Sequence, residues 1–256
     1  MTMTAPIGVQ LYSLRDALAQ DFEAVVRQVA AMGYLGVETH EFPGTTPQAA
    51  AALFKSLGLQ AFAGHKPLPL GDSRQEVLET MAALDCTYLV CPWLDPQTHF
   101  ATRAQVERVC DLLNEANQVA RDHNLTLAYH NHHFEFQPVE GEYPYRIMLE
   151  RLDPSVVFEI DTYWVKTAGL DPAAIVREMG ARAPLLHLKD GPCTLTDPMV
   201  AAGEGVMDFP GIISASNGNV QWAIVELDRC ATDMLTAVRK SYDYLVSKGL
   251  AHGRQS

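Results

Sequence analysis

Three histidines and one carboxylate lie within residues 129–136, which read YHNHHFEF. An apolar run at 125–128 precedes them and predicts a buried strand that ends at the histidines. Imidazole and carboxylate groups together bind Mn²⁺, Zn²⁺, Co²⁺ or Fe²⁺ well, whereas Mg²⁺ prefers oxygen ligands alone. The stretch therefore indicates a metal-binding or acid–base site at the end of this strand.

Three later apolar runs also end in side chains that can coordinate a metal ion. These side chains are Glu159 and Asp161, His187, and Glu226 and Asp228. Six of the nine histidines fall at expected strand ends, namely His40, His65, His130, His132, His133 and His187. A random scatter would not concentrate histidine in this way. We expect a scaffold that gathers these strand ends around a metal ion and a small polyhydroxylated substrate.

Strand geometry separates the members of the histidine cluster. Successive side chains of a strand point to opposite faces, so His130 and His132 share one face and His133 points the other way. Glu159 and Asp161 likewise share a face. We expect the face with His130 and His132 to point into the site.

Each candidate also has a purely structural interpretation. A single histidine at a strand end could be a hydrogen-bonded packing residue. A buried carboxylate such as Glu159 or Glu226 could pair with a neighbouring Lys or Arg, since an unpaired one is costly. Arg15, Lys66 and Lys189 could simply neutralise these acids.

The overall charge narrows the choice of partner. The chain has 19 Lys and Arg against 31 Asp and Glu, a net charge of −12. This balance disfavours nucleic acid and anionic membranes, which both select clustered basic residues. No stretch approaches the ~18 apolar residues of a membrane span, and the first residues lack signal-peptide features. The five cysteines are odd in number and show no CxxC spacing, so we expect a reducing cytoplasm.

Short apolar strands alternate with amphipathic helices along the chain. The expected strands cover residues 7–14, 36–42, 60–65, 87–92, 125–128, 156–161, 185–189 and 220–228. The expected helices cover residues 21–32, 47–57, 73–84, 102–123, 145–152, 172–180, 209–215 and 231–248. We expect residues 249–256 to form a flexible tail.

Eight strand–helix units in 256 residues match the size of one (β/α)8 TIM barrel, and we expect residues 1–256 to form this single domain. A doubly wound open sheet is the alternative. Against it, the chain has no G-x-G-x-x-G after the first strand and no G-x-x-x-x-G-K-[ST]. A barrel brings the carboxyl ends of all its strands to one face, where the candidate groups would meet.

Five motifs resemble those of the sugar phosphate isomerase/epimerase superfamily, the xylose isomerase-like barrels, in order and spacing. They are YHNHHFEF (129–136), EIDTYWV (159–165), HLKD (187–190), GEGVMDF (203–209) and IVELD (224–228). GVQLYSLRD (8–16) and GYLGVE (33–38) are also similar. The resemblance covers nearly the whole chain. It is specific for the superfamily but weak for any one substrate.

The resemblance implies a divalent metal ion held by Glu, Asp, His and Glu on strands five to eight. Asp161, His187 and Glu226 match three of these positions. Many relatives carry Glu-Asn-His on strand five, whereas this chain has His-Asn-His, so His130 stands at the glutamate position. The implied ligands are therefore His130, Asp161, His187 and Glu226, with His132 as the alternative to His130 and Mn, Zn, Co or Mg as the metal.

This departure bears on the chemistry. In the epimerases, the carboxylates of strands five and eight move a proton on and off a carbon beside a carbonyl. With His130 at one position, a histidine, Glu159 or Glu38 must replace one of the two bases. We expect a metal-dependent isomerase or epimerase of a sugar or keto-sugar, which abstracts a proton α to a carbonyl through an enediolate that the metal stabilises.

Residue roles follow from this expectation. Glu226 is the expected base, His132 its partner or a substrate-orienting group, and Lys189 a donor to a substrate oxygen. Expected substrate contacts are Glu38, His65, Trp93, Glu135, Glu159 and Trp164. The two tryptophans could pack in the core or offer aromatic faces to a sugar ring. Neutral carbohydrates fit better than phosphorylated ones, because the chain lacks an evident Gly-rich phosphate cradle.

Other functions remain open at this point. A metal-dependent lyase or hydratase of 3-keto-glycosides would share nearly every residue, because β-elimination begins with the same proton abstraction. A barrel endonuclease of the superfamily is disfavoured by the net charge of −12. A non-catalytic sugar-binding barrel is the choice if metal is absent, and the sequence is compatible with a homo-oligomer.

Overall fold

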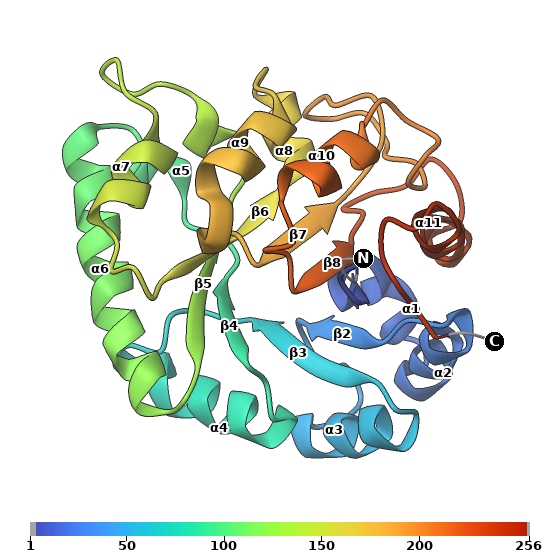
Figure 1. Cartoon of the computed structure of the whole chain (residues 1–256). Coiled ribbons are helices and arrows are strands. Elements are labelled where there is room, and N and C mark those ends of the chain that lie inside the picture. The colour runs from blue at the N-terminus through green and yellow to red at the C-terminus, as the bar shows by residue number, and fades with distance from the viewer. Residues whose placement is uncertain (1–3, 255–256) are drawn as a thin grey trace.

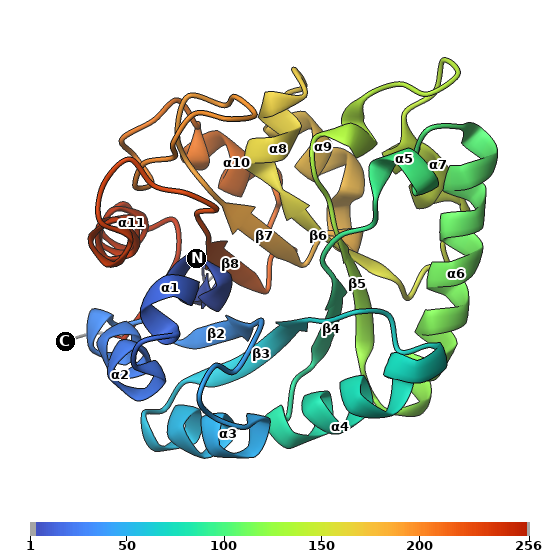
Figure 2. The ribbon, with the colours of Figure 1, turned by 180° about the vertical axis from the view of Figure 1, so that it is seen from behind.

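Eight parallel strands close into one barrel in chain order in the computed structural model, which describes residues 4–254 (Figure 1; Figure 2 gives the view from behind). The strands are β1 (Ile7–Gln10), β2 (Gly36–Thr39), β3 (Gln60–His65), β4 (Tyr88–Cys91), β5 (Thr126–His130), β6 (Val157–Asp161), β7 (Leu185–Leu188) and β8 (Trp222–Val225). Pairing of Val9 with Val225 joins β1 to β8 and closes the sheet. The expected (β/α)8 barrel is confirmed.

The helices lie around the outside of the barrel, as Figure 1 shows. They are α1 (Arg15–Leu18), α2 (Phe22–Met32), α3 (Pro47–Ser56), α4 (Arg74–Leu84), α5 (Pro96–His99), α6 (Arg103–Asp122), α7 (Pro144–Arg151), α8 (Thr162–Thr167), α9 (Pro172–Met179), α10 (Phe209–Ala215) and α11 (Met234–Ser247). Asp21, Thr46 and Thr102 each begin a helix by accepting a hydrogen bond from a backbone N–H of its first turn. Within residues 4–254, no helix has the length and apolarity needed to cross a membrane.

The lower interior of the barrel, toward the amino ends of the strands, is apolar. This apolar layer consists of Phe62, Ala63, Tyr88, Val90, Ala128, Leu185, Trp222 and Ile224. The rings of Phe62 and Trp222 stack with their centroids 4.0 Å apart. A Cβ on Gly36 would lie 2.7 Å from Trp222 and 2.8 Å from Phe62, so glycine is required for β2 to pass these rings. Two residues further along β5 to β8, the inward positions become polar.

The start of the chain differs from the expected strand over 7–14. The strand ends at Gln10, whose side chain accepts a hydrogen bond from the backbone N–H of Tyr12, and Leu11–Leu14 form a 3-10 helix. The short helices α1, α5 and α8 also lie outside the expected elements. Helix α8 begins directly after β6, because the side chain of Asp161, the last residue of β6, caps the first turn of the helix.

The tail expected to be flexible is packed as far as the structure describes it. Leu250 is buried. The backbone N–H of His252 donates to the carbonyl of Ala5 at 2.9 Å. The expectation is therefore wrong for residues 249–254, while 255–256 lie outside the described residues.

Candidate active site

The carboxyl ends of β5 to β8 bring four candidate ligands together in the upper interior. His130, Asp161, His187 and Glu226 offer ligand atoms that all lie within 4.8 Å of one another, and all four side chains are buried. The strand register places Asp161 beside His187 across β6 and β7. These four residues, called the upper set below, are the ones that the resemblance implies.

Lys189 lies among the carboxylates of the upper set. Its Nζ is 2.9 Å from Asp161 Oδ2, 2.7 Å from Glu226 Oε2 and 3.1 Å from Asp228 Oδ2. Burial disfavours the ammonium, but these carboxylates outweigh it and raise the pKa of Lys189 well above its ordinary value. The ammonium therefore balances part of the negative charge that a divalent cation would also balance.

Glu38, His65 and Glu159 contact one another and the rings of His130 and His187, and they are called the lower set. Glu159 Oε1 is 2.8 Å from His65 Nε2, 2.9 Å from His130 Nδ1 and 3.0 Å from His187 Nε2. Glu38 Oε2 is 2.7 Å from His187 Nε2. The sequence predicts that all three contact substrate, but Glu38 and Glu159 are fully buried and face histidine rings.

Burial and neighbouring charges set the protonation of the site. Burial would raise the pKa of Glu226, but Lys189 and His187 hold that pKa well below its ordinary value, so the carboxylate is ionised at neutral pH. Burial and the nearby His187 lower the pKa of His130 well below its ordinary value. His130 is therefore a neutral ring with one nitrogen lone pair available for a ligand.

The donors of the upper set fit a divalent cation. Asp161 Oδ2 is buried and accepts no aligned hydrogen bond from the residues 4–254 that the structure describes, although the Lys189 ammonium is 2.9 Å away. Two imidazoles and two carboxylates suit Zn²⁺, Mn²⁺, Co²⁺ and Fe²⁺. A second combination of side chains meets the same 4.8 Å spacing, namely His65, His130, Glu159 and His187.

A pocket of about 300 Å³ lies beside the upper set. Its lining residues are Tyr12, His40, His65, Pro92, Trp93, His130, His132, Glu226 and Asp228. The volume is at the lower end of the range for small-molecule sites. Trp93 is 53% exposed and can offer its ring to a ligand. Trp164 is only 7% exposed, and Lys189 Nζ lies over its ring, 5.6 Å from the ring centroid. The indole therefore packs against the lysine ammonium.

Tyr12, His40 and Pro92 line the pocket but are absent from the site that the sequence predicts. Tyr12 falls within the expected first strand, and only the 3-10 helix brings it against His40, at 5.1 Å between ring centroids. His40 is one of the strand-end histidines, and that position is the signal that could have found it. For Pro92, the sequence carries no comparable signal.

Glu135 lies behind the pocket. It is 1% exposed, and it accepts hydrogen bonds from the Tyr129 hydroxyl at 2.6 Å and the His132 backbone N–H at 2.8 Å. These two hydrogen bonds hold Glu135 against the histidine loop, and its expected contact with substrate stays a prediction. Asn131 also supports the histidine loop, because its Oδ1 accepts a hydrogen bond from the backbone N–H of Asp161 at 3.0 Å.

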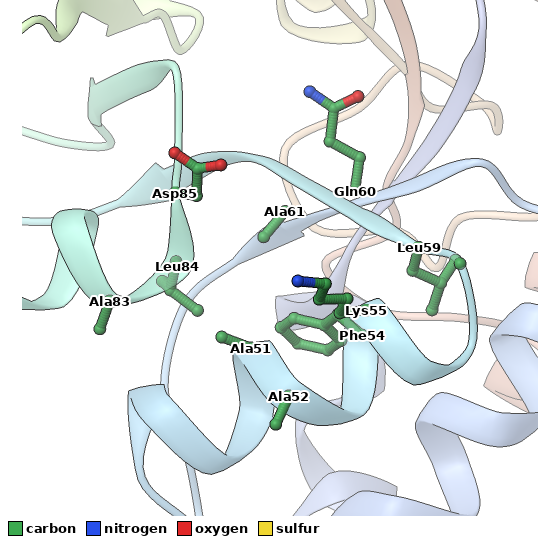
Figure 3. Close-up of a pocket in the computed structure, with 11 residues that line it drawn as sticks. Ala51, Ala52, Phe54, Lys55, Leu59, Gln60, Ala61, Ala83, Leu84 and Asp85 are labelled. Carbon is green, nitrogen blue, oxygen red and sulfur yellow. The ribbon is translucent and has the colours of Figure 1, made fainter.

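A groove of about 590 Å³ lies at the opposite end of the barrel, where β3 begins and α3 and α4 end. Figure 3 shows Lys55, Gln60 and Asp85 among the alanine and leucine side chains that line it. None of the candidate site residues lines this groove. The candidate residues therefore lie away from this groove, at the carboxyl ends of the strands.

A closed barrel with histidines and carboxylates at the carboxyl ends of its strands defines a TIM-barrel protein with a candidate metal centre. Residues 26–245 match the family described as xylose isomerase-like TIM barrel, and the chain belongs to this family. The superfamily expected from the motifs is thereby confirmed. A search of curated proteins found no match.

Three solved structures are similar over nearly their whole length. A sugar phosphate isomerase/epimerase from Parabacteroides distasonis has a TM-score of 0.80 at 25% identity, covering 94% of this chain and 98% of that one. An L-ribulose 3-epimerase has a TM-score of 0.71 at 13% identity, covering 96% and 94%. The IOLI protein, with a bound zinc atom, has a TM-score of 0.73 at 14% identity, covering 96% and 98%. The last two likenesses show the fold alone.

Proposed function

We propose that the protein is a metal-dependent isomerase or epimerase of a sugar or keto-sugar, acting by proton transfer at a carbon beside a carbonyl. The observation that carries the proposal is the convergence of the upper set and Lys189 beside a pocket of about 300 Å³. Such a site at the carboxyl ends of barrel strands is where TIM-barrel enzymes do their chemistry. The similarity to a sugar phosphate isomerase/epimerase supports the substrate class.

His130, Asp161, His187 and Glu226 would hold the cation. When bound, a divalent metal ion would supply Lewis-acid polarisation of the substrate carbonyl. The net charge of the surroundings suits this role, because one ammonium faces three carboxylates at Lys189. The rest of the chemistry falls to the side chains.

Glu226 is the proposed base. Its Oε2 is already 2.6 Å from His187 Nδ1 and 2.7 Å from Lys189 Nζ, which leaves Oε1 to take a proton from carbon. The C–H electron pair then forms a carbon–carbon double bond, and the carbonyl electron pair moves onto oxygen, where Lys189 can donate a hydrogen bond. Return of the proton to the neighbouring carbon, together with transfer of the hydroxyl proton of that carbon's neighbour to the former carbonyl oxygen, gives an isomer. Delivery of a proton to the opposite face of the original carbon by a second acid gives an epimer.

His132 is the proposed substrate-orienting group. Burial and the nearby Lys189 lower the pKa of His132 to about 3, so the ring is neutral at pH 7. Its ring lines the pocket, and its Nδ1 is buried without a hydrogen-bond partner in residues 4–254. A neutral ring with unused hydrogen-bonding capacity can orient a sugar hydroxyl.

A lyase or hydratase of 3-keto-glycosides is the second candidate, and one observation favours it. A second pocket of about 270 Å³ shares Tyr12 and His40 with the first and adds apolar walls from Leu11, Leu18 and Pro43. A leaving group would fit there. After the same proton abstraction, the electron pair would expel the glycosidic oxygen instead of accepting a proton.

Replacement of Glu226 by Gln tests the proposal, with Glu204→Gln as the matched control, because Glu204 pairs with Lys240 at the surface. Turnover of ketoses and 3-keto-glycosides is measured together with bound metal. We expect a 100-fold or greater loss of turnover at equal metal loading, the usual cost of removing a general base. Unchanged turnover with retained metal would remove Glu226 from the mechanism, and the products would separate isomerase from lyase.

A further inference from the structure

We infer that Glu159 and Glu38 are positioning residues that hold His130 and His187 in the orientation and tautomer required to bind the cation. This inference deepens the proposed function and rests on the metal centre proposed there. It gives the two buried carboxylates a role in metal affinity in place of the substrate contact that their sequence positions predict.

The first step is the geometry of the two rings, each of which faces both sets. His130 turns Nε2 toward Asp161 Oδ2, at 3.9 Å, and Nδ1 toward Glu159 Oε1, at 2.9 Å. His187 turns Nδ1 toward Glu226 Oε2, at 2.6 Å, and Nε2 toward Glu38 Oε2, at 2.7 Å. One nitrogen of each ring therefore belongs to the upper set, and the other belongs to the lower set.

The second step is the proton on the lower nitrogens. A carboxylate only accepts hydrogen bonds, so a ring nitrogen 2.7 to 2.9 Å away must donate an N–H to it. A neutral imidazole with one N–H has its lone pair on the other nitrogen. Glu159 thus assigns the lone pair of His130 to Nε2, which faces Asp161 of the upper set. In His187 both nitrogens lie at hydrogen-bond distance from a carboxylate, since Nδ1 is 2.6 Å from Glu226 Oε2. A cation in the upper set would replace the proton on Nδ1, and Glu38 would keep the other proton on Nε2.

The third step is to weigh a cation in the second combination of His65, His130, Glu159 and His187. Glu159 Oε1 there lies 2.8 to 3.0 Å from three ring nitrogens, which is hydrogen-bond spacing. A nitrogen that donates an N–H has no lone pair for a metal ion. In the upper set only His187 Nδ1 lies at hydrogen-bond distance from a carboxylate, 2.6 Å from Glu226 Oε2, whereas His130 Nε2 is 3.9 Å from Asp161 Oδ2. This difference favours the upper set as the cation position.

One oxygen of the lower set has no partner. Glu159 Oε2 is buried and accepts no hydrogen bond from the residues 4–254 that the structure describes, whereas Glu38 Oε1 is 3.3 Å from His65 Nε2. Leaving a buried acceptor without a partner is costly, so stability alone does not explain a carboxylate at Glu159. A carboxylate behind a metal-binding histidine fixes its tautomer and strengthens it as a ligand, and its loss typically weakens metal affinity 10- to 100-fold.

The test compares Glu159→Gln and Glu38→Gln with wild type and with the surface control Glu204→Gln. Zn²⁺ dissociation constants are measured on metal-stripped protein by competition with a chelating indicator. Visible absorption of the Co²⁺-loaded forms reports the ligand field, and circular dichroism reports folding. We expect each lower-set variant to bind Zn²⁺ about 10- to 100-fold more weakly and to shift the Co²⁺ bands. A merely structural role would leave the Co²⁺ bands in place at saturating metal.

Several outcomes would overturn the inference. If wild type binds metal and both folded variants bind it equally well, the carboxylates do not position the histidines. If His65→Gln abolishes binding while Asp161→Asn leaves it unchanged, the cation lies in the lower combination. If wild type binds none of Zn²⁺, Mn²⁺ and Co²⁺, the proposed metal function fails first and the inference falls with it. Two independent carboxylate variants keep the test decisive if one of them does not fold.

Discussion

The lower interior of the barrel is filled by an apolar layer around Phe62 and Trp222, whereas the upper interior holds carboxylates, histidines and the buried Lys189. Both regions come from the same strands and the residues directly after them: Trp222 begins β8 and is apolar, and Glu226 follows its last residue and is polar. Apolar burial stabilises the fold by roughly 25 cal/mol per Å². Buried charges carry a desolvation penalty that pairing only partly offsets. The comparison teaches that the side chains that stabilise the fold and those proposed to carry out chemistry occupy different levels along the barrel axis.

A similar division exists within the polar region. Glu159 and Asp161 stand two residues apart on β6, yet the first faces histidine rings and the second faces Lys189. On β7, His187 contacts both sets, and Lys189, directly after β7, contacts carboxylates of the upper set and Asp228. A step of two residues therefore separates the side chains that we propose position the metal ligands from those that we propose meet the substrate.

We expect the largest effect from truncation of the apolar layer, which should lower stability and leave metal binding unchanged. Phe62→Ala removes a fully buried ring that stacks on Trp222, and we expect a loss of about 3–5 kcal/mol in the free energy of unfolding. Urea unfolding measures this loss. The folded variant should bind Zn²⁺ as tightly as wild type, and a large loss of affinity would show that the two layers are not separable.

Removal of the buried ammonium should have the next largest effect. Lys189→Met removes the ammonium shared by Asp161, Glu226 and Asp228, and we expect the metal-free protein to lose about 3 kcal/mol in the free energy of unfolding. Saturating Zn²⁺ should stabilise this variant more than wild type. The control Lys240→Met breaks a 2.8 Å surface pair and should cost less than about 1 kcal/mol. Equal losses for both variants in urea unfolding would contradict the account.

The pH dependence of the free energy of unfolding tests the role of the buried Glu135 behind the pocket. Burial raises the pKa of Glu135 to about 7 from an ordinary 4.5. Between these values the folded protein keeps a proton that the unfolded chain has lost, so this group makes stability fall as pH rises from about 4.5 to about 7. Glu135→Gln cannot titrate, and its free energy of unfolding should fall less across this window, by on the order of 1–3 kcal/mol. Parallel curves for wild type and variant would be inconsistent with the raised pKa.

Strand alternation and chain order predict the barrel and the meeting of the strand ends, and the family resemblance implies the upper set. Prediction from the sequence fails where those rules stop. Glu135 follows the end of β5, so alternation does not apply, and a Tyr129 hydrogen bond turns it away from the pocket. The position of Tyr12 depends on a 3-10 helix that the Gln10 side chain stabilises, and hydrophobic periodicity does not predict such a helix. The depth that separates Glu159 from the pocket depends on barrel curvature, which a linear pattern does not contain.

Exchange of solvent deuterium tests the central claim most directly. The metal-loaded and metal-stripped proteins are incubated with ketoses and keto-sugars in ²H₂O, and proton NMR follows the carbon beside the carbonyl. The account predicts that deuterium enters at that carbon with loaded wild type, and at least about 100-fold more slowly with the stripped protein or with Glu226→Gln. Equal exchange in loaded and stripped protein, or no exchange by the loaded protein with any of these sugars, would contradict it.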